Sequence, residues 1–166
     1  MMNCLEKRSQ AMKKVGLIVN PIAGMGGRVG LKGSDGNEIL KKAKEMGAQA
    51  EAPERTIKAL MSVVPLKDSI EVVTYPYDMG EEEAITCGIA PKVIGHIKRE
   101  KTDANDTFKA ARKMEQLAVD LLLFAGGDGT ARDIYRAIGD KIPALGIPTG
   151  VKMHSAVFAI SPKYAG

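Results

Sequence analysis

A glycine-rich turn directly follows a run of apolar residues in the carboxyl-terminal half of the chain. Leu121-Leu122-Leu123-Phe124 predicts a buried strand, and Gly126-Gly127-Asp128-Gly129-Thr130 follows it after one alanine. Glycines at a strand tip let a ligand approach backbone N–H groups, and a helix predicted over 131–138 directs its positive end toward the same place. Phosphate suits such a turn. A carboxylate in the same turn would repel a phosphate, so its presence indicates a functional role. It could hold a divalent cation, orient a sugar hydroxyl or accept the proton of an attacking hydroxyl.

Each of the two carboxylates in this region also has a plain structural explanation. Asp-Gly pairs are common in turns, so Asp128 is also explained as an Asx residue that caps the next helix. Asp133 lies one turn into that predicted helix, where an acid interacts favourably with the helix dipole. Both residues therefore stay candidates for a binding or catalytic site with a structural alternative beside them.

A second glycine-rich segment runs from Gly24 to Gly36 and includes Arg28 and Lys32. Ordering many glycines costs backbone entropy, which favours a phosphate-binding loop whose two basic side chains neutralise the ligand; a flexible linker is the alternative. The segment is no Walker A loop, because Gly33 rather than Ser or Thr follows Lys32. It also fits a dinucleotide-binding fingerprint poorly, since the glycines continue to Gly36 before the next predicted helix.

The elements that would position these loops alternate along the chain. Hydrophobic periodicity predicts strands at 15–19, 70–75, 91–94, 120–124 and 143–147, and helices at 37–46, 53–63, 80–87, 102–117, 131–138 and 153–160. Thr102 or Asp103 is expected to cap the helix over 102–117. Such alternation predicts an α/β fold of the Rossmann-like three-layer type, with a mostly parallel sheet and helices on both faces. The glycine loops would then gather at the carboxyl edge of the sheet.

Three loops together carry a family resemblance. Val19-Asn20-Pro21 ends the first predicted strand, Gly126-Gly127-Asp128-Gly129-Thr130 follows the fourth, and Gly146-Ile147-Pro148-Thr149-Gly150 closes the fifth. In this order they resemble the ATP-NAD kinase and diacylglycerol kinase superfamily, over nearly the whole chain. The segments 130–134 and 150–158 look most like the ATP-NAD kinase-like branch that includes proteins encoded with acetoin-catabolism enzymes. The resemblance implies the N-terminal domain fold of these kinases.

The resemblance implies a phosphotransferase that moves a phosphoryl group from ATP or polyphosphate to the ribose 2′-hydroxyl of NAD, with Mg²⁺ bridging the donor phosphates. Asp128 would be the catalytic residue, which contacts the acceptor hydroxyl, and no residue is predicted as a metal ligand. Thr102 matches a nucleotide-contacting threonine of the lipid-kinase branch, with the helix cap as alternative, and Lys152 is explained equally well as a solvent-facing lysine. The predicted cofactor-binding residues are Asn20, Gly24, Gly26, Gly27, Arg28, Lys32, Thr102, Gly126, Gly127, Gly129, Thr130, Asp133, Thr149, Gly150 and Lys152.

The resemblance also predicts the domain organisation. Residues 1–14 form an N-terminal extension and 15–166 the N-terminal α/β domain, whereas the superfamily's second, mostly β domain is expected to be absent from this chain. The isolated chain is therefore expected to be inactive without that second domain. Two other functions stay open, a lipid or sphingoid-base kinase-like domain and a non-catalytic nucleotide-sensing module. Superfamily members commonly self-associate, so a homo-oligomer is a further possibility.

The composition of the chain limits the classes of partner it can bind and indicates its cellular location. The chain has 166 residues, 45% of them hydrophobic, and a formal net charge of +4. Its basic residues are scattered among carboxylates without interleaved aromatics, which argues against a nucleic-acid partner. No apolar run approaches the roughly 20 residues of a membrane span, and we expect no membrane partner. Cys4 and Cys87 lie far apart and are expected to be reduced thiols, which indicates a cytoplasmic protein.

Overall fold

Five parallel strands form one sheet in the order β3-β2-β1-β4-β5 in the computed structural model, which describes residues 12–25, 47, 49–99, 101–150 and 153–166. The strands are β1 (Lys13–Val19), β2 (Ile70–Thr74), β3 (Lys92–Val93), β4 (Leu121–Gly126) and β5 (Ala144–Pro148). All five predicted strands are present. The sheet confirms the α/β fold class expected from the alternation of elements.

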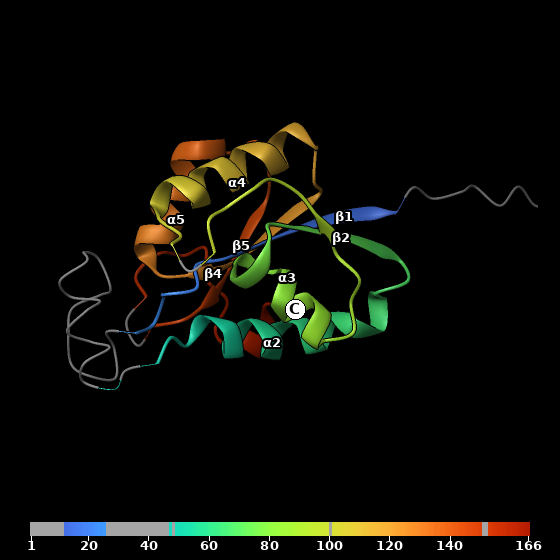
Figure 1. Ribbon diagram of the computed structural model, residues 1–166, viewed down its shortest axis with the longest axis horizontal. Coiled ribbons are helices and arrows are strands. Elements are labelled where there is room, and N and C mark those ends of the chain that lie inside the picture. Colours follow the sequence, from blue (N-terminus) through green and yellow to red (C-terminus); the bar gives the residue numbers. More distant parts are fainter. Residues whose placement is uncertain (1–11, 26–46, 48, 100, 151–152) are drawn as a thin grey trace, which may run out of the picture.

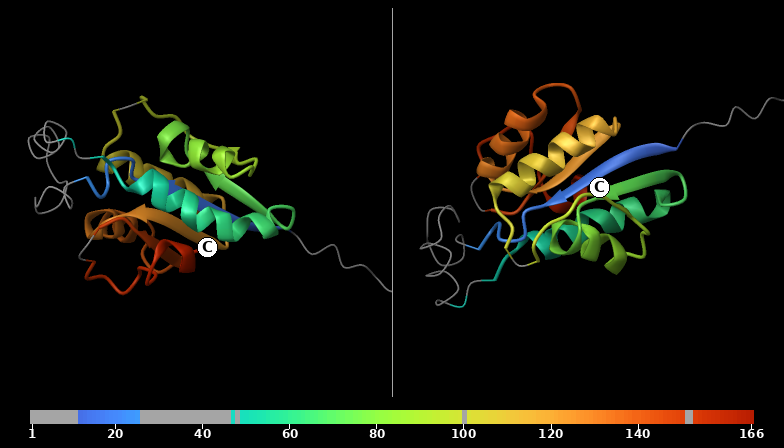
Figure 2. Two further views of the ribbon diagram at one scale, coloured as in Figure 1. Left: turned by 90° about the horizontal axis from the view of Figure 1, so that it is seen from below. Right: turned by 45° about the horizontal axis from the view of Figure 1, so that its top comes forward.

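Helices cover both faces of this sheet, as Figures 1 and 2 show. On one face lie α2 (Ala52–Val63) and α3 (Glu81–Thr86), and on the other lie α4 (Ala104–Gln116) and α5 (Asp128–Ile138). Short 3₁₀ turns occur at Val64–Leu66, Tyr77–Met79 and Pro162–Tyr164, and the last of these packs against α2. The three-layer arrangement follows from parallel strands, because each must be linked to the next by a crossover that packs on a face.

The two apolar cores result from the alternation of side chains along the central strands. In β1, Leu17 and Val19 point into the core under α2 and α3, whereas Ile18 points into the core under α4 and α5. In β4, Leu123 joins the first core and Phe124 the second. Strands that are buried on both faces read as continuous apolar runs, which is why both strands stand out in the sequence.

The direction of chain progression reverses between β1 and β4. From β1 the chain moves outward through β2 to β3, and it then returns to the other side of β1 to form β4 and β5. Beside the carboxyl ends of two strands with such a reversal, the connecting loops diverge to opposite faces and leave a crevice in which α/β proteins bind ligands. The loop after β1 begins at Asn20, and the loop after β4 contains Asp128.

Two of the helix predictions need correction. The helix predicted over 153–160 does not form; instead this segment runs beside β5, where the Gly146 N–H donates to the Val157 carbonyl (2.9 Å) and the Ala159 N–H donates to the Gly146 carbonyl (2.9 Å). Phe158 packs edge-on against Phe124, with ring centroids 5.4 Å apart. Pairing with the sheet edge thus replaces the helical hydrogen bonds. The helix predicted over 131–138 is present but begins three residues earlier, at Asp128.

The other helix predictions are confirmed or lie outside the described residues. Asp103 rather than Thr102 caps α4, and it does so in a capping box with Asp106. The helix predicted over 37–46 and most of the glycine-rich segment from Gly24 to Gly36 lie outside the described residues. Cys87 is buried with a free thiol, and Cys4 lies outside the described residues.

Candidate functional site

The Asp128 carboxylate links the loop after β4 to the chain that follows β5. Its Oδ2 accepts a hydrogen bond from the His154 backbone N–H (3.1 Å), and its Oδ1 accepts one from the Ser155 backbone N–H (3.1 Å). Asp128 is the first residue of α5, whose N-cap is Gly127, and the hydrogen bonds described for its carboxylate go to His154 and Ser155 and not to the helix. The carboxylate is therefore oriented by the third loop, and the alternative that Asp128 serves as an Asx cap is not what the structure shows.

Asn20 bridges the chain reversal between β1 and β4. Its side-chain Nδ2 donates to Thr130 Oγ1 (3.0 Å), its Oδ1 accepts from the Ile22 N–H (3.3 Å), and its backbone N–H donates to the Ala125 carbonyl (2.9 Å). An asparagine offers both a donor and an acceptor at the end of one short side chain, so it can tie two loops at once. The bond to Thr130 holds the first loop against α5, the bond to Ala125 holds it against the end of β4, and the bond from Ile22 shapes the loop itself.

Gly126 lets Thr130 fold back over the end of β4. A Cβ at Gly126 would collide with the Thr130 side chain, which is 4% exposed. Gly127 has open space around the position of a Cβ. The first glycine is thus required for close packing inside the turn, whereas a side chain at the second would meet no neighbour within 4 Å.

The first loop also contacts the third loop at Gly24. This residue has φ +84°, and a Cβ there would collide with the Thr149 carbonyl and lie 2.9 Å from Glu51 Cβ. Thr149 is 1% exposed, and its Oγ1 has no hydrogen-bond partner among the described residues. An unsatisfied buried hydroxyl costs about 1–3 kcal/mol, and such groups are often explained by an ordered water or a ligand.

Arg55 joins the site from α2, and the sequence analysis did not single it out. Its Nη1 donates to the Pro148 carbonyl (3.2 Å) at the end of β5, and its Nε donates to Glu51 Oε2 (2.7 Å), which also pairs with Nη2. An arginine four residues after a glutamate in an amphipathic helix is most simply explained as a surface ion pair. Its position near the start of the predicted helix over 53–63 is the one feature of the sequence that could have indicated a binding role, and this indication is weak.

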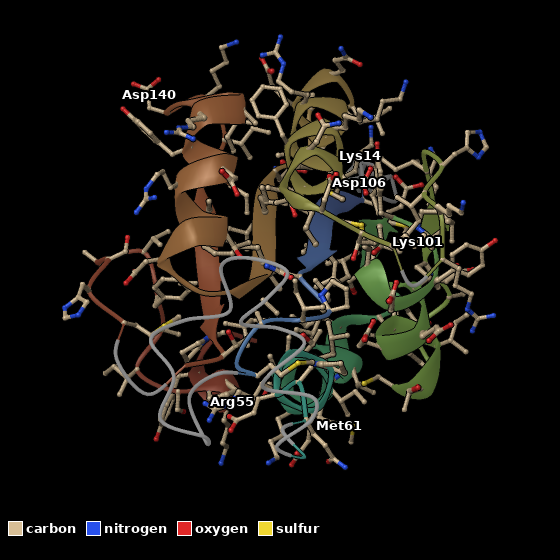
Figure 3. All side chains as sticks on the ribbon, turned by 60° about the vertical axis from the view of Figure 1, so that its left-hand side comes forward. Lys14, Arg55, Met61, Lys101, Asp106 and Asp140 are labelled. Atoms are coloured by element: carbon tan, nitrogen blue, oxygen red, sulfur yellow. The ribbon has the colours of Figure 1, made fainter. Side chains whose placement is uncertain are left out.

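A cavity of about 360 Å³ lies beside the third loop. Its lining residues include Arg55, Pro148, Gly150, Met153, Ser155 and Phe158. Figure 3 shows Arg55 next to the red carboxyl-terminal ribbon. Because Ser155 both lines the cavity and donates its N–H to Asp128, a single short segment separates the cavity from the carboxylate.

Comparison with known proteins identifies the family that these loops represent. The model of the ATP-NAD kinase N-terminal domain matches residues 15–166. The chain belongs to this family. The match covers all the described strands except the first two residues of β1, together with all three loops, and it confirms the superfamily resemblance carried by the three loops.

Other comparisons add little to this identification. No curated protein matches the chain. Among solved structures, a crystal structure of UDP-N-acetylglucosamine 2-epimerase is similar at 14% identity with a TM-score of 0.42, over 82% of this chain. This chain spans 33% of the epimerase chain, and a likeness at that level carries no argument about activity. No helix among the described residues is long and apolar enough to cross a membrane.

Not all predicted binding residues come together in this NAD kinase-family domain. Asn20, Gly24, Gly126, Gly127, Gly129, Thr130, Thr149 and Gly150 lie in or beside the three loops at the carboxyl edge of the sheet. Asp133 lies farther along α5, where it is 3.9 Å from Arg136 Nη1. Thr102 precedes α4, and no hydrogen bond described by the structure links it to the three loops. The predicted residues outside the described part of the chain are Gly26, Gly27, Arg28, Lys32 and Lys152.

The donor set at this edge suits a metal held mainly by a substrate. Among the described residues, no group of three or more His, Cys, Asp or Glu side chains could hold a metal ion. Asp128 offers one carboxylate with both oxygens already hydrogen-bonded to backbone N–H groups. Mg²⁺ commonly takes one or two carboxylates together with substrate phosphates and waters, so a single carboxylate here fits a Mg²⁺–ATP complex better than a resident ion.

Proposed function

We propose that this domain binds NAD at the chain reversal between β1 and β4 and takes part in phosphoryl transfer from ATP or polyphosphate to the ribose 2′-hydroxyl of NAD. The observation that carries the proposal is the position of Asp128, which lies at the tip of β4 and at the start of α5, with its carboxylate oriented by two N–H groups of the third loop. Family membership supports the reaction type.

Asp128 can orient an acceptor hydroxyl without losing its own position. A carboxylate offers about four lone-pair sites, and the bonds from His154 and Ser155 use one on each oxygen. The other site on either oxygen can accept the O–H of a ribose and direct the hydroxyl oxygen toward the donor phosphate. In this arrangement the carboxylate takes the proton as the new P–O bond forms and the bond to the leaving phosphate breaks.

The rest of the site contributes backbone N–H groups at the start of α5 and a fixed arrangement of the three loops. The first N–H groups of α5 have no partners within the helix, so they are suited to bind phosphate oxygens next to Asp128. Asn20 and Gly24 hold the first loop against the second and third loops, which keeps the three loops in one arrangement. Mg²⁺, carried by the donor, would neutralise the phosphate charge during transfer.

The test measures binding first and turnover second. Isothermal titration of the chain with NAD in the presence of Mg²⁺ and ATP should give a saturable isotherm, and Asp128→Ala should weaken it at least tenfold. Asp140→Ala is the matched control, because Asp140 is an exposed carboxylate just beyond the end of the same helix. Equal NAD affinities for the wild type and Asp128→Ala would remove Asp128 from the acceptor site.

Turnover separates a kinase from a nucleotide-sensing module. NADP formation is measured for the protein that contains this domain, supplied with NAD, Mg²⁺ and either ATP or polyphosphate. Asp128→Asn should lower kcat at least 100-fold, since a positioned base contributes about 10² to 10⁴, while thermal unfolding shows that the fold is kept. NAD binding without any NADP would favour a sensing module, and transfer to a lipid or sphingoid base instead of NAD would favour the lipid-kinase alternative.

A further inference from the structure

The guanidinium of Arg55 has donors left for a ligand. It carries five N–H groups, and the contacts with Glu51 and Pro148 engage each of its three nitrogens once. As far as the described residues go, one N–H on Nη1 and one on Nη2 remain. The side chain is 29% exposed and lines the cavity beside the third loop, so these donors lie where a ligand can reach them.

The cavity places this cation beside a mixed lining of polar, small and apolar residues. Met153, Phe158, Ile160 and Pro162 line it together with the small residues Gly150 and Ser155. Its volume of about 360 Å³ lies within the roughly 300–1,000 Å³ typical of small-molecule sites. A planar guanidinium suits a phosphate group, because the fork of N–H groups matches phosphate oxygens, and the half-buried Met153 offers a contact for a ring attached to that phosphate.

The paired carboxylate of Glu51 both anchors the Arg55 guanidinium and neutralises part of its charge. Glu51 is 15% exposed, and its backbone N–H donates to the Ala23 carbonyl (3.1 Å) of the first loop. Arg55 is therefore fixed between α2, the first loop and the end of β5. This fixed position lowers the entropy lost on binding, while the partial neutralisation limits the affinity for an anion.

We propose that Arg55 binds the phosphate group of a nucleotide whose ring lies against Met153, so that the cavity is a phosphate-ester subsite beside the third loop. That this nucleotide is part of the acceptor rests on the proposed function. Phosphate binding at Arg55 does not, because it depends only on the guanidinium and the cavity.

The test uses AMP and adenosine as probes, which share the ring and differ in the phosphate. In ¹H–¹⁵N spectra of the wild-type chain, the Arg55 Nε–H signal and the amide signals of Gly150 and Ser155 should shift saturably with AMP. Arg55→Gln should weaken AMP binding at least tenfold and leave the weaker binding of adenosine unchanged. The AMP affinity of Arg55→Lys should lie between those of the wild type and Arg55→Gln, since lysine keeps the positive charge and lacks the paired N–H groups of the guanidinium.

Two further variants separate phosphate recognition from a purely structural role of the ion pair. Lys58→Gln is the matched control, because Lys58 forms the same type of pair with Glu54 on α2 and does not line the cavity. It should leave AMP binding unchanged. Glu51→Gln should strengthen AMP binding severalfold, because it removes the carboxylate that competes for the guanidinium; a pair with only a structural role would give an unchanged or weaker affinity.

The outcomes distinguish this inference from the proposed function. AMP binding that depends on Arg55, in a protein that does not phosphorylate NAD, would support the subsite and overturn the proposed acceptor. Equal shifts with AMP and adenosine, no saturable shift with AMP, or unchanged AMP affinity in Arg55→Gln would each overturn the subsite. Thermal unfolding of each variant shows whether the fold is retained. The titration of the wild type with AMP and adenosine tests the subsite even if a variant fails to fold.

Discussion

At the level of single residues, the site depends on side chains that connect loops. Asp128 connects the start of α5 to the third loop, and Asn20 connects the end of β1 to Thr130. Each uses a short polar side chain with few rotatable bonds, so little conformational entropy is lost when the loops are joined. In the proposed function the same groups also contact the substrate. Their structural and functional roles are therefore coupled, and a substitution at either residue must be tested for both.

Gly126 and Gly127 offer a matched pair for testing the packing of the turn. Gly126→Ala should lower the free energy of unfolding by about 1–3 kcal/mol, because the new methyl group collides with the Thr130 side chain. Gly127→Ala should lower it by about 1 kcal/mol or less, since its Cβ would meet nothing within 4 Å and the remaining cost is the poorer N-cap that alanine makes for α5. Urea unfolding measures both. Equal effects would show that Thr130 does not pack on Gly126 as described.

Glu83 should give the domain a measurable dependence on pH. This residue is 4% exposed, and burial raises its pKa to about 7, with a smaller contribution from the charges of Glu82 and Asp78. Between pH 4.5 and 7 the folded state keeps a proton that the unfolded state releases. The free energy of unfolding therefore falls as the pH rises through this range, by about 3 kcal/mol from this group.

The Glu83→Gln variant tests that assignment. It should remove most of this pH dependence, so that the variant gains stability relative to the wild type between pH 5 and pH 8 in urea unfolding. Glu82→Gln is the control, because its side chain is 49% exposed and pairs with Arg99 at the surface. Parallel stability curves for wild type and Glu83→Gln across this range would show that Glu83 ionises normally in the folded state.

At the level of elements, the segment after β5 illustrates how tertiary contacts override local pattern. Residues 153–160 were predicted as a helix, yet their backbone pairs with Gly146 of β5 and Phe158 packs on Phe124. Gly146 allows this contact, because a Cβ there would collide with the Phe158 ring. A sequence window contains no information about a free sheet edge, so the periodicity of this segment could not reveal its partner.

The α4 helix, by contrast, has a start that is encoded locally. Asp103 accepts hydrogen bonds from the N–H groups of Asn105 (2.8 Å) and Asp106 (3.1 Å). Asp103→Ala should lower the free energy of unfolding by about 1 kcal/mol, because two N–H groups of the first turn lose their acceptor. Asp103→Asn should keep most of the stability. Thermal or urea unfolding measures the difference, and equal stability of Asp103→Ala and the wild type would contradict a contribution from the cap.

At the level of the whole molecule, the sheet predicts the order in which the fold opens. β1 lies between β2 and β4, and Leu17, Ile18 and Val19 are fully buried, whereas both residues of β3 are exposed at the sheet edge. Amide hydrogen exchange should be slowest in β1, with an opening free energy equal to that of global unfolding, and faster at Ile94, whose N–H donates to Thr74 beside β3. Uniform protection across the sheet would contradict this order.

The sequence alone determined the fold class and the position of the central motif. Apolar runs predicted the five strands, and the alternation with helices predicted the parallel sheet, because these signals depend on local periodicity and on the need to bury both faces. The glycine turn around Asp128 was visible for the same reason. A cap at Thr102 or Asp103 was also predicted, since a cap bonds to N–H groups within the next three residues, and the structure selects Asp103.

Only the tertiary structure decided which groups meet. The bonds from His154 and Ser155 to Asp128 join residues 26 and 27 positions apart, and the contact from Arg55 to Pro148 spans 93. No local pattern encodes such pairs, because they arise where the chain reverses between β1 and β4 and brings separate loops to one edge. The sequence therefore identified the residues able to do chemistry, while the arrangement of the sheet determined that Arg55 and its cavity lie beside them.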